Sequence, residues 1–227
     1  MGSLIISFSG RKNGNCDEIG QYIASTAPGE NRFVRFGELN VHPCSGCEYE
    51  CFGGACRYRE DDIYSLWEET GGYDRVILIV PMYCGNPASL YFVFNERSQD
   101  YFSHNESDYE DVVRRLYIIG VYGKAETSPD FVPCLEQWFE GSGYTGRVLG
   151  IERHLYGQKL GDRVLDVAEV AEKIGEFLKE GWGCKMSGEI WLAAFKRLEA
   201  SRKLCSEPVE YDKEGEAAMN AKYGSVD

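Results

Sequence analysis

Short apolar segments alternate along this chain with segments of helical periodicity, and this alternation limits the possible folds more than any other feature. The clearest segment, Arg75-Val76-Ile77-Leu78-Ile79-Val80, is continuously apolar after its first residue, as expected of a strand buried on both faces. Further strands are expected at residues 4–8, 33–36, 116–121 and 148–151. Helices are expected at residues 16–27, 61–70, 88–102, 129–140 and 162–180. Such alternation is typical of a parallel sheet with helices on both faces.

Five strands in this pattern predict an α/β protein with a doubly wound parallel sheet, for which the flavodoxin-like arrangement is the natural candidate. This domain is expected to cover residues 1–181, with Asp162 capping or opening its last helix. Residues 182–227 are expected to form a helical C-terminal extension that ends in a polar tail. The extension helix, from Ser187 to Leu204, combines an apolar stripe with a basic face. We interpret it as packing on the domain or on a second subunit, with a membrane surface as the alternative.

The charge balance excludes several classes of partner. The chain has 24 Lys and Arg against 37 Asp and Glu, a net charge of −13, whereas nucleic-acid backbones are bound by clustered cations. No apolar run approaches the roughly 20 residues that a membrane span needs. The first six residues, Met1-Gly2-Ser3-Leu4-Ile5-Ile6, lack the positive region of a signal peptide. We therefore expect a cytoplasmic protein with no nucleic-acid and no membrane partner.

The segment between the first expected strand and the first expected helix has the composition of an anion-binding turn. It consists of Ser9-Gly10-Arg11-Lys12-Asn13-Gly14-Asn15-Cys16. Its two glycines allow the backbone to curl, its Ser and Asn side chains are donors, and Arg11 adds a positive charge. The helix that follows offers unpaired N–H groups to a phosphate. The segment matches neither the dinucleotide-binding nor the Walker pattern, and an ordinary polar turn is the alternative.

Two further strand ends are candidates for the same crevice, because ligands of doubly wound folds bind beyond the carboxyl ends of strands. The clearest strand continues into Pro81-Met82-Tyr83-Cys84-Gly85-Asn86-Pro87, which is expected to be a rigid loop that holds a flat heteroaromatic ring. The strand at 116–121 continues into Tyr122 and Gly123, which are expected to close the crevice.

Taken together, three motifs resemble the flavodoxin-fold NAD(P)H-dependent FMN reductases, in particular the branch that contains iron–sulfur flavoproteins. They are Ser9-x-Arg11-x-x-Gly14-Asn15, the run from Pro43 through the cysteines to Asp61-Asp62, and Pro81-x-Tyr83-x-x-x-Pro87 with Phe94-x-Glu96-Arg97. The resemblance covers about residues 3–180. It implies a homodimer or higher homo-oligomer with the flavin near the subunit interface.

The resemblance also assigns the cofactor site. The FMN phosphate is expected to be bound by Ser9, Arg11, Asn13, Gly14, Asn15 and Cys16. The isoalloxazine ring is expected to be lined by Pro81, Met82, Tyr83, Cys84, Gly85 and Asn86, with Tyr122 and Gly123 on its other edge. Two positions depart from the family: Cys16 replaces a usual Ser or Thr, which weakens a phosphate donor, and Phe92 replaces a frequent Lys.

Nine cysteines in a chain expected to remain in a reducing compartment favour metal binding or redox chemistry over a disulfide framework. Four of them form a compact group, with two, three and four residues between successive members: Cys44, Cys47, Cys51 and Cys56. This spacing is compatible with a 4Fe–4S cluster, with a Cys₄ zinc site, or with free thiols or a disulfide that hold no metal.

The sequence thus predicts an FMN-dependent oxidoreductase that takes a hydride from NAD(P)H and passes electrons to a second acceptor, either a small molecule or a redox protein. No catalytic side chain is expected, because the flavin carries the chemistry. One alternative is a flavin or iron–sulfur electron carrier without its own substrate. Another is a flavin-free module held together by zinc or thiols.

Overall fold

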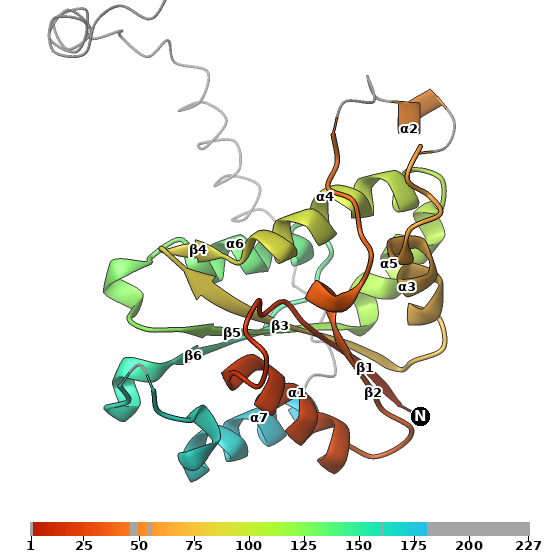
Figure 1. Cartoon of the computed structure of the whole chain (residues 1–227). Helices are drawn as coiled ribbons and strands as arrows, with labels where there is room; N and C mark the ends of the chain where they lie inside the picture. The colour runs from red at the N-terminus through yellow and green to blue at the C-terminus, as the bar shows by residue number, and fades with distance from the viewer. Residues whose placement is uncertain (1, 46–49, 54–55, 160, 181–227) are drawn as a thin grey trace, which may run out of the picture. The chain divides into compact units, whose positions relative to one another are not determined.

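A computed structural model describes residues 2–45, 50–53, 56–159 and 161–180, which are built around one central sheet (Figure 1). Five parallel strands lie in the order β2-β1-β3-β5-β6, and a short β4 pairs antiparallel with the end of β3. The strands are β1 Ser3–Ser7, β2 Arg32–Arg35, β3 Arg75–Tyr83, β4 Asn86–Pro87, β5 Leu116–Tyr122 and β6 Val148–Glu152. This is the flavodoxin-like strand order, so the expected fold class is confirmed. The expected extension at 182–227 lies outside the described residues.

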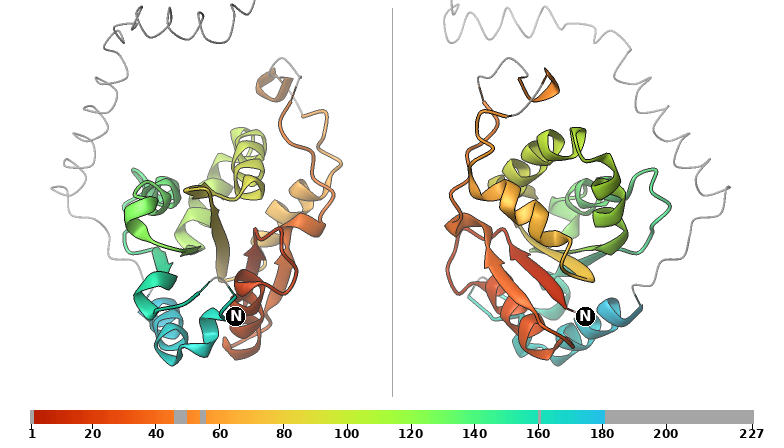
Figure 2. Two further views of the ribbon diagram at one scale, coloured as in Figure 1. Left: turned by 60° about the vertical axis from the view of Figure 1, so that its left-hand side comes forward. Right: turned by 90° about the vertical axis from the view of Figure 1, so that its right-hand side faces the viewer.

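Helices cover both faces of the sheet. They are α1 Asn15–Thr26, α2 Glu50–Gly53, α3 Asp62–Thr70, α4 Ser89–Ser103, α5 Glu106–Arg115, α6 Phe131–Glu136 and α7 Ala168–Glu180. Short 3₁₀ turns are η1 Phe36–Glu38, η2 Ala125–Thr127, η3 Gln137–Phe139, η4 Arg153–Tyr156 and η5 Val164–Asp166. Figures 1 and 2 show α1 and α7 on one face and α3, α4, α5 and α6 on the other. Among the described helices, none has the length and apolar character needed to cross a bilayer.

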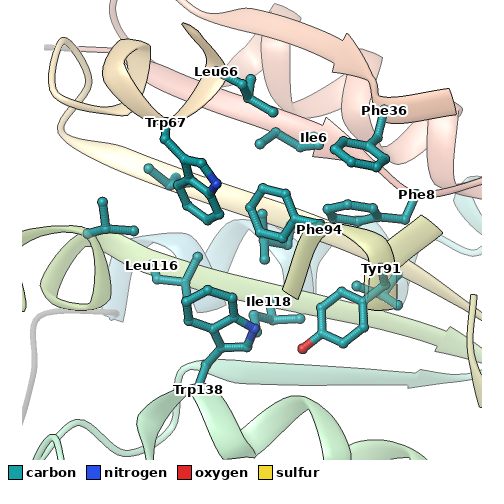
Figure 3. Close-up of a cluster of buried hydrophobic side chains, with 14 of the residues drawn as sticks. Ile6, Phe8, Phe36, Leu66, Trp67, Tyr91, Phe94, Leu116, Ile118 and Trp138 are labelled. Atoms are coloured by element: carbon teal, nitrogen blue, oxygen red, sulfur yellow. The ribbon is translucent and has the colours of Figure 1, made fainter. Parts of the chain in front are cut away.

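Two apolar layers hold the helices to the sheet, because successive strand residues point to opposite faces. In β1, Leu4 and Ile6 belong to the layer under α3 to α6, whereas Ile5 belongs to the layer under α1 and α7. The first layer is rich in aromatic rings (Figure 3). Trp67 of α3 and Phe94 of α4 lie with ring centroids 4.3 Å apart. This packing fixes α4, whose N-terminus follows β4 at the carboxyl edge of the sheet.

The structure contains α2, β4 and α5, which were not expected, and it begins the last helix later than expected. Helix α5 was not predicted, since its buried apolar residues, Val112 and Val113, are adjacent and show no helical spacing. The last helix begins at Ala168, so the prediction that Asp162 caps or opens it is wrong. The Asp162 carboxylate instead accepts the backbone N–H of Lys159 at 2.6 Å. Residues 153–167, of which residue 160 lies outside the described residues, therefore connect β6 to α7.

Candidate functional site

The carboxyl ends of β1, β3 and β5 open into a cleft of about 530 Å³. Three walls of this cleft come from loop 9–16, from the end of β3 and from the residues that follow β5. The predicted site residues that line it are Ser9, Arg11, Asn13, Gly14, Asn15, Cys16, Pro81, Met82, Tyr83, Tyr122 and Gly123. The expected convergence of the three segments is therefore confirmed. A fourth wall, which the sequence analysis did not anticipate, comes from the connection between β6 and α7.

The N-terminus of α1 faces this cleft without a side-chain cap. Gly14 is the N-cap residue, and no side-chain cap is present among the residues that the structure describes. Asn15 and Cys16, the first two helical residues, line the cleft. Uncapped first-turn N–H groups and the helix dipole make such a position suitable for an anion. Arg11 is exposed beside it, and its guanidinium has no polar partner among the described residues.

Loop 9–14 is held by hydrogen bonds within the loop and by hydrogen bonds to Asp17 and Arg163. The Ser9 hydroxyl lies 3.1 Å from both the N–H and the C=O of Arg11, which closes a tight turn. Asn13 has a φ of 55°, in the left-handed region that non-glycine residues rarely adopt. Its N–H donates to Asp17 at 2.9 Å, and its C=O accepts from Arg163 at 2.7 Å. These hydrogen bonds define the shape of the loop.

The side chain of Asn15 makes two hydrogen bonds to the connection between β6 and α7. Its Oδ1 accepts the backbone N–H of Val164 at 3.0 Å, and its Nδ2 donates to the C=O of Asp162 at 3.4 Å. Asn15 thus ties the start of α1 to the connection between β6 and α7. Its Nδ2 has a second N–H, so the expectation that the Asn15 amide donates to a phosphate stays a prediction.

Cys16 is 3% exposed and packs in the apolar layer under α1. Burial raises the pKa of its thiol, and the neighbouring carboxylate of Asp17 raises that pKa further. The thiol is therefore neutral and only a weak donor. This position contributes packing and a backbone N–H to the cleft.

Half of the expected ring-binding loop is a β-hairpin turn. Strand β3 continues to Tyr83, which pairs with Asn86 of β4. Cys84 and Gly85 form the two-residue turn between them, with φ values of 50° and 84°, as in type I′ turns. Pro81, Met82 and Tyr83 line the cleft, whereas the residues predicted with them, Cys84, Gly85 and Asn86, are not among its lining residues.

The fourth wall brings in residues that the sequence analysis missed: Arg153, Gly161, Asp162 and Arg163. The Arg153 guanidinium donates to the C=O of Lys159 and, at 3.1 Å, to the C=O of Asp162. Arg163 forms an ion pair with Glu18 of α1. The contacts of Arg153 lie within the connection, whereas the pair between Arg163 and Glu18 holds the connection against the start of α1. The polar, glycine-containing sequence from Gly157 to Gly161 was the available signal for a loop at this place.

The cleft is basic although the chain is strongly acidic. Four cationic side chains, those of Arg11, Lys12, Arg153 and Arg163, line it together with one carboxylate, that of Asp162. Lys12 pairs with Glu38 and Arg163 with Glu18, whereas Arg11 is a lining cation that no described acidic side chain neutralises, and it favours an anionic ligand.

The described parts of the segment 44–56, which carries the four clustered cysteines, contact α4 and the turn that follows it. The N–H of Cys44 donates to Glu96 at 2.7 Å, and the C=O of Cys51 lies 2.7 Å from Nε2 of His104. Cys56 is buried, which raises the pKa of its thiol. Within the described ranges, no three His, Cys, Asp or Glu side chains lie close enough to bind a metal ion. Cys47 is outside those ranges, so a cluster or zinc site on the four cysteines stays a prediction.

The strand order and the position of the cleft at the carboxyl ends of β1, β3 and β5 define a flavodoxin-like α/β protein. No model of a protein family matches the chain, and a comparison with curated proteins finds no match either. Among solved structures, it is similar to the Trp repressor binding protein from Bacillus subtilis, with 17% identity, a TM-score of 0.52, and 78% of this chain and 97% of the other covered.

A second similar structure is that of RosB with a bound intermediate, 8-demethyl-8-formylriboflavin-5'-phosphate. The identity is 13% and the TM-score 0.51, with 100% of this chain and 88% of the other covered. At such identities the likeness shows a shared fold.

Proposed function

We propose that this protein is an FMN-dependent oxidoreductase that takes a hydride from NAD(P)H and passes the electrons to a second acceptor. One observation carries the proposal: the N-terminus of α1 and the guanidinium of Arg11, which has no polar partner in the described part of the chain, lie in one cleft with Tyr83 and Gly123. This places an anion-binding end and an aromatic wall within one site. The flavin 5'-phosphate bound in RosB, a protein of the same fold, supports the assignment.

The residues present fit such a cofactor. The cleft volume of about 530 Å³ lies within the range of roughly 300–1,000 Å³ typical of small-molecule sites. A Cβ added at Gly123 meets no atom within 4 Å, so the backbone after β5 leaves open space there. The lining combines cations near loop 9–14 with Met82, Tyr83 and Tyr122 at the strand ends. The two ends of the cleft thus suit the two parts of FMN.

In this proposal the protein binds the cofactor and orients it. The backbone amides at the start of α1 and the guanidinium of Arg11 hold the phosphate, which gains charge-assisted hydrogen bonds. Met82 and Tyr83 flank the ring, and the backbone at Gly123 limits its movement at the other edge. When bound, FMN supplies the two-electron chemistry. The described cleft residues need not act as acid or base.

The test starts with the purified full chain. We expect a yellow preparation, or an apoprotein that quenches FMN fluorescence on titration, followed by oxidation of NADH or NADPH with ferricyanide as acceptor. Arg11→Ala should weaken FMN binding by about tenfold or more through loss of a charge-assisted contact. Arg59→Ala is the matched control, because Arg59 is equally exposed and does not line the cleft. A chain that binds no FMN under these conditions would refute the proposal.

The acidic chain also favours an electron carrier that docks on basic redox partners and has no substrate of its own. FMN binding without NADH or NADPH oxidation would support this second candidate. A colourless preparation that contains zinc would support the flavin-free module instead.

A further inference from the structure

Asn13, at the bend of loop 9–14, is held by two charged side chains that lie outside the loop. The carboxylate of Asp17 accepts its N–H at 2.9 Å, and the guanidinium of Arg163 donates to its C=O at 2.7 Å. Both backbone groups of Asn13 are thus engaged at its left-handed φ of 55°. This conformation is unfavourable for most non-glycine residues, although Asn tolerates it better than others. The bend therefore depends on these external contacts.

Asp17 is the more buried of the two partners, with 1% exposure. Its Oδ1 accepts from the Ser7 hydroxyl at 2.8 Å, and its Oδ2 accepts from Nε of Arg35 at 2.7 Å in addition to the N–H of Asn13. The carboxylate therefore connects α1 to β1, to β2 and to the loop. Because an arginine is its ion-pair partner, its charge is balanced inside the protein.

The same network reaches a second loop residue. Arg35 donates to Glu38 at 2.6 Å, and Glu38 pairs with Lys12 at 2.9 Å. Lys12 and Asn13, two consecutive residues of the loop, are thus connected through Arg35 to one buried carboxylate. The contact to Lys12 is exposed and contributes little, so the contact between Asp17 and Asn13 carries the restraint.

We propose that Asp17 is a positioning residue for phosphate recognition, and this inference rests on the proposed function. By fixing the bend at Asn13, Asp17 keeps the amides of Gly14 and Asn15 directed to the cleft. The site then prefers a phosphorylated flavin over unphosphorylated riboflavin. Asp17 itself does not contact the ligand, since it is buried and does not line the cleft. Its effect is a preorganised loop, which lowers the ordering cost of binding.

Two substitutions distinguish the effect of the hydrogen-bond acceptors of Asp17 from the effect of its charge. In Asp17→Asn, the amide oxygen can take the place of Oδ2 and accept from Asn13 and Arg35. The NH₂ group can then donate to the Ser7 hydroxyl, because a hydroxyl is an acceptor as well as a donor. Asp17→Asn should therefore keep the bend. Asp17→Ala removes every acceptor and should release it.

The experiment compares FMN and riboflavin binding by fluorescence titration of the full chain. Relative to the unmodified protein, Asp17→Ala should weaken FMN binding roughly tenfold or more, in line with the loss of a charge-assisted hydrogen bond, and riboflavin binding by less than about threefold. Asp17→Asn should keep most of the FMN affinity. If Asp17→Ala does not fold, Asp17→Ser provides the same comparison with a shorter side chain. Equal losses for the two flavins would overturn the inference.

Asp61→Ala is the matched control. Asp61 is also a buried carboxylate at a helix N-terminus with an arginine partner, Arg97, but it accepts from His42 and Ile63 and not from loop 9–14. This variant should lower the melting temperature as Asp17→Ala does, yet leave the ratio of FMN to riboflavin affinity unchanged. A similar change of that ratio in both variants would show that general destabilisation is the cause, and would overturn the inference.

A measurement without flavin distinguishes a failure of the inference about Asp17 from a failure of the proposed function. If the unmodified chain binds neither flavin, the proposed function fails, and inorganic phosphate observed by ³¹P NMR then tests the loop alone. Phosphate binding that Asp17→Ala abolishes would uphold the role of Asp17. Phosphate binding that is unchanged in the variant, or absent from the unmodified chain, would refute it.

Discussion

Nη1 of Arg97 donates to Oδ2 of Asp61 at 2.6 Å, and both side chains are almost completely buried. Asp61 also caps α3 by accepting the N–H of Ile63 at 3.2 Å. The same guanidinium donates to the C=O of His42 at 2.7 Å and to that of Tyr58 at 3.2 Å. One ion pair thus joins α4 to both ends of the segment that carries the four cysteines.

Replacing Arg97 by Met should destabilise the protein by about 3–5 kcal/mol, because it leaves the Asp61 carboxylate buried without its partner. Urea unfolding followed by circular dichroism measures the change. Arg114→Met is the control, since its ion pair with Asp111 is solvent-exposed and is expected to contribute less than about 1 kcal/mol. Similar losses in the two variants would contradict the role assigned to the buried pair.

Replacing two helix glycines by Ala should change the stability of the protein in opposite directions. A Cβ at Gly20 of α1 would collide with the ring of Phe33, so Gly20→Ala should cost about 1–3 kcal/mol by overpacking. A Cβ at Gly175 of α7 meets no atom within 4 Å, so Gly175→Ala should stabilise by about 0.5–1 kcal/mol through helix propensity. Thermal melts of both variants test the pair. Stabilisation by Gly20→Ala would show that α1 does not pack on β2 as described.

The turn between β3 and β4 should become more stable with Asn in place of Cys84. Cys84 adopts a φ of 50°, and Asn is a preferred residue at this position of type I′ turns. Cys84→Asn should recover part of the roughly 1–3 kcal/mol that such a conformation costs other residues. Gly85→Ala, at a φ of 84°, should destabilise by about 1 kcal/mol or more. A melting temperature that rises for Gly85→Ala or falls for Cys84→Asn would argue against this turn.

The thiols of Cys84 and Cys16 should differ in reactivity. Cys84 is exposed, whereas Cys16 is buried with a thiol pKa raised by that burial, and the thiolate is the reactive form. Brief treatment of the native chain with iodoacetamide should therefore label Cys84 and spare Cys16, as read by peptide mass spectrometry. Both should react in denaturant. Early labelling of Cys16 would place the start of α1 outside the apolar layer.

Most of the fold could be predicted because the strands are short, continuously apolar runs that alternate with segments of helical spacing. Residues 75–80 lie in β3 and residues 116–121 in β5, as expected. Helix α5 could not be predicted from an apolar stripe. It docks partly through Arg115, whose Nη1 donates to the C=O of Thr70 at 2.6 Å, and a polar contact of this kind leaves no periodic signal.

The lining of the cleft was predictable where the chain continues along a strand to the carboxyl edge of the sheet. Ser9 just after β1 and Tyr83 at the end of β3 are examples. The candidate site was not predictable where a side chain has two possible roles. Asn15 has the chemistry of a phosphate donor, yet its amide holds the backbone of residues 162 and 164, a contact between positions about 150 residues apart. Sequence order alone contains no information on such a pairing.

The strands that end at the cleft also form both apolar layers, so occupancy of the cleft and unfolding of the whole domain are thermodynamically linked. A ligand that binds only the folded chain adds about 2.7 kcal/mol of stability at a concentration one hundred times its dissociation constant. A thermal-shift screen across flavins, nucleotides and inorganic anions would therefore rank ligands directly, before any electron acceptor is known.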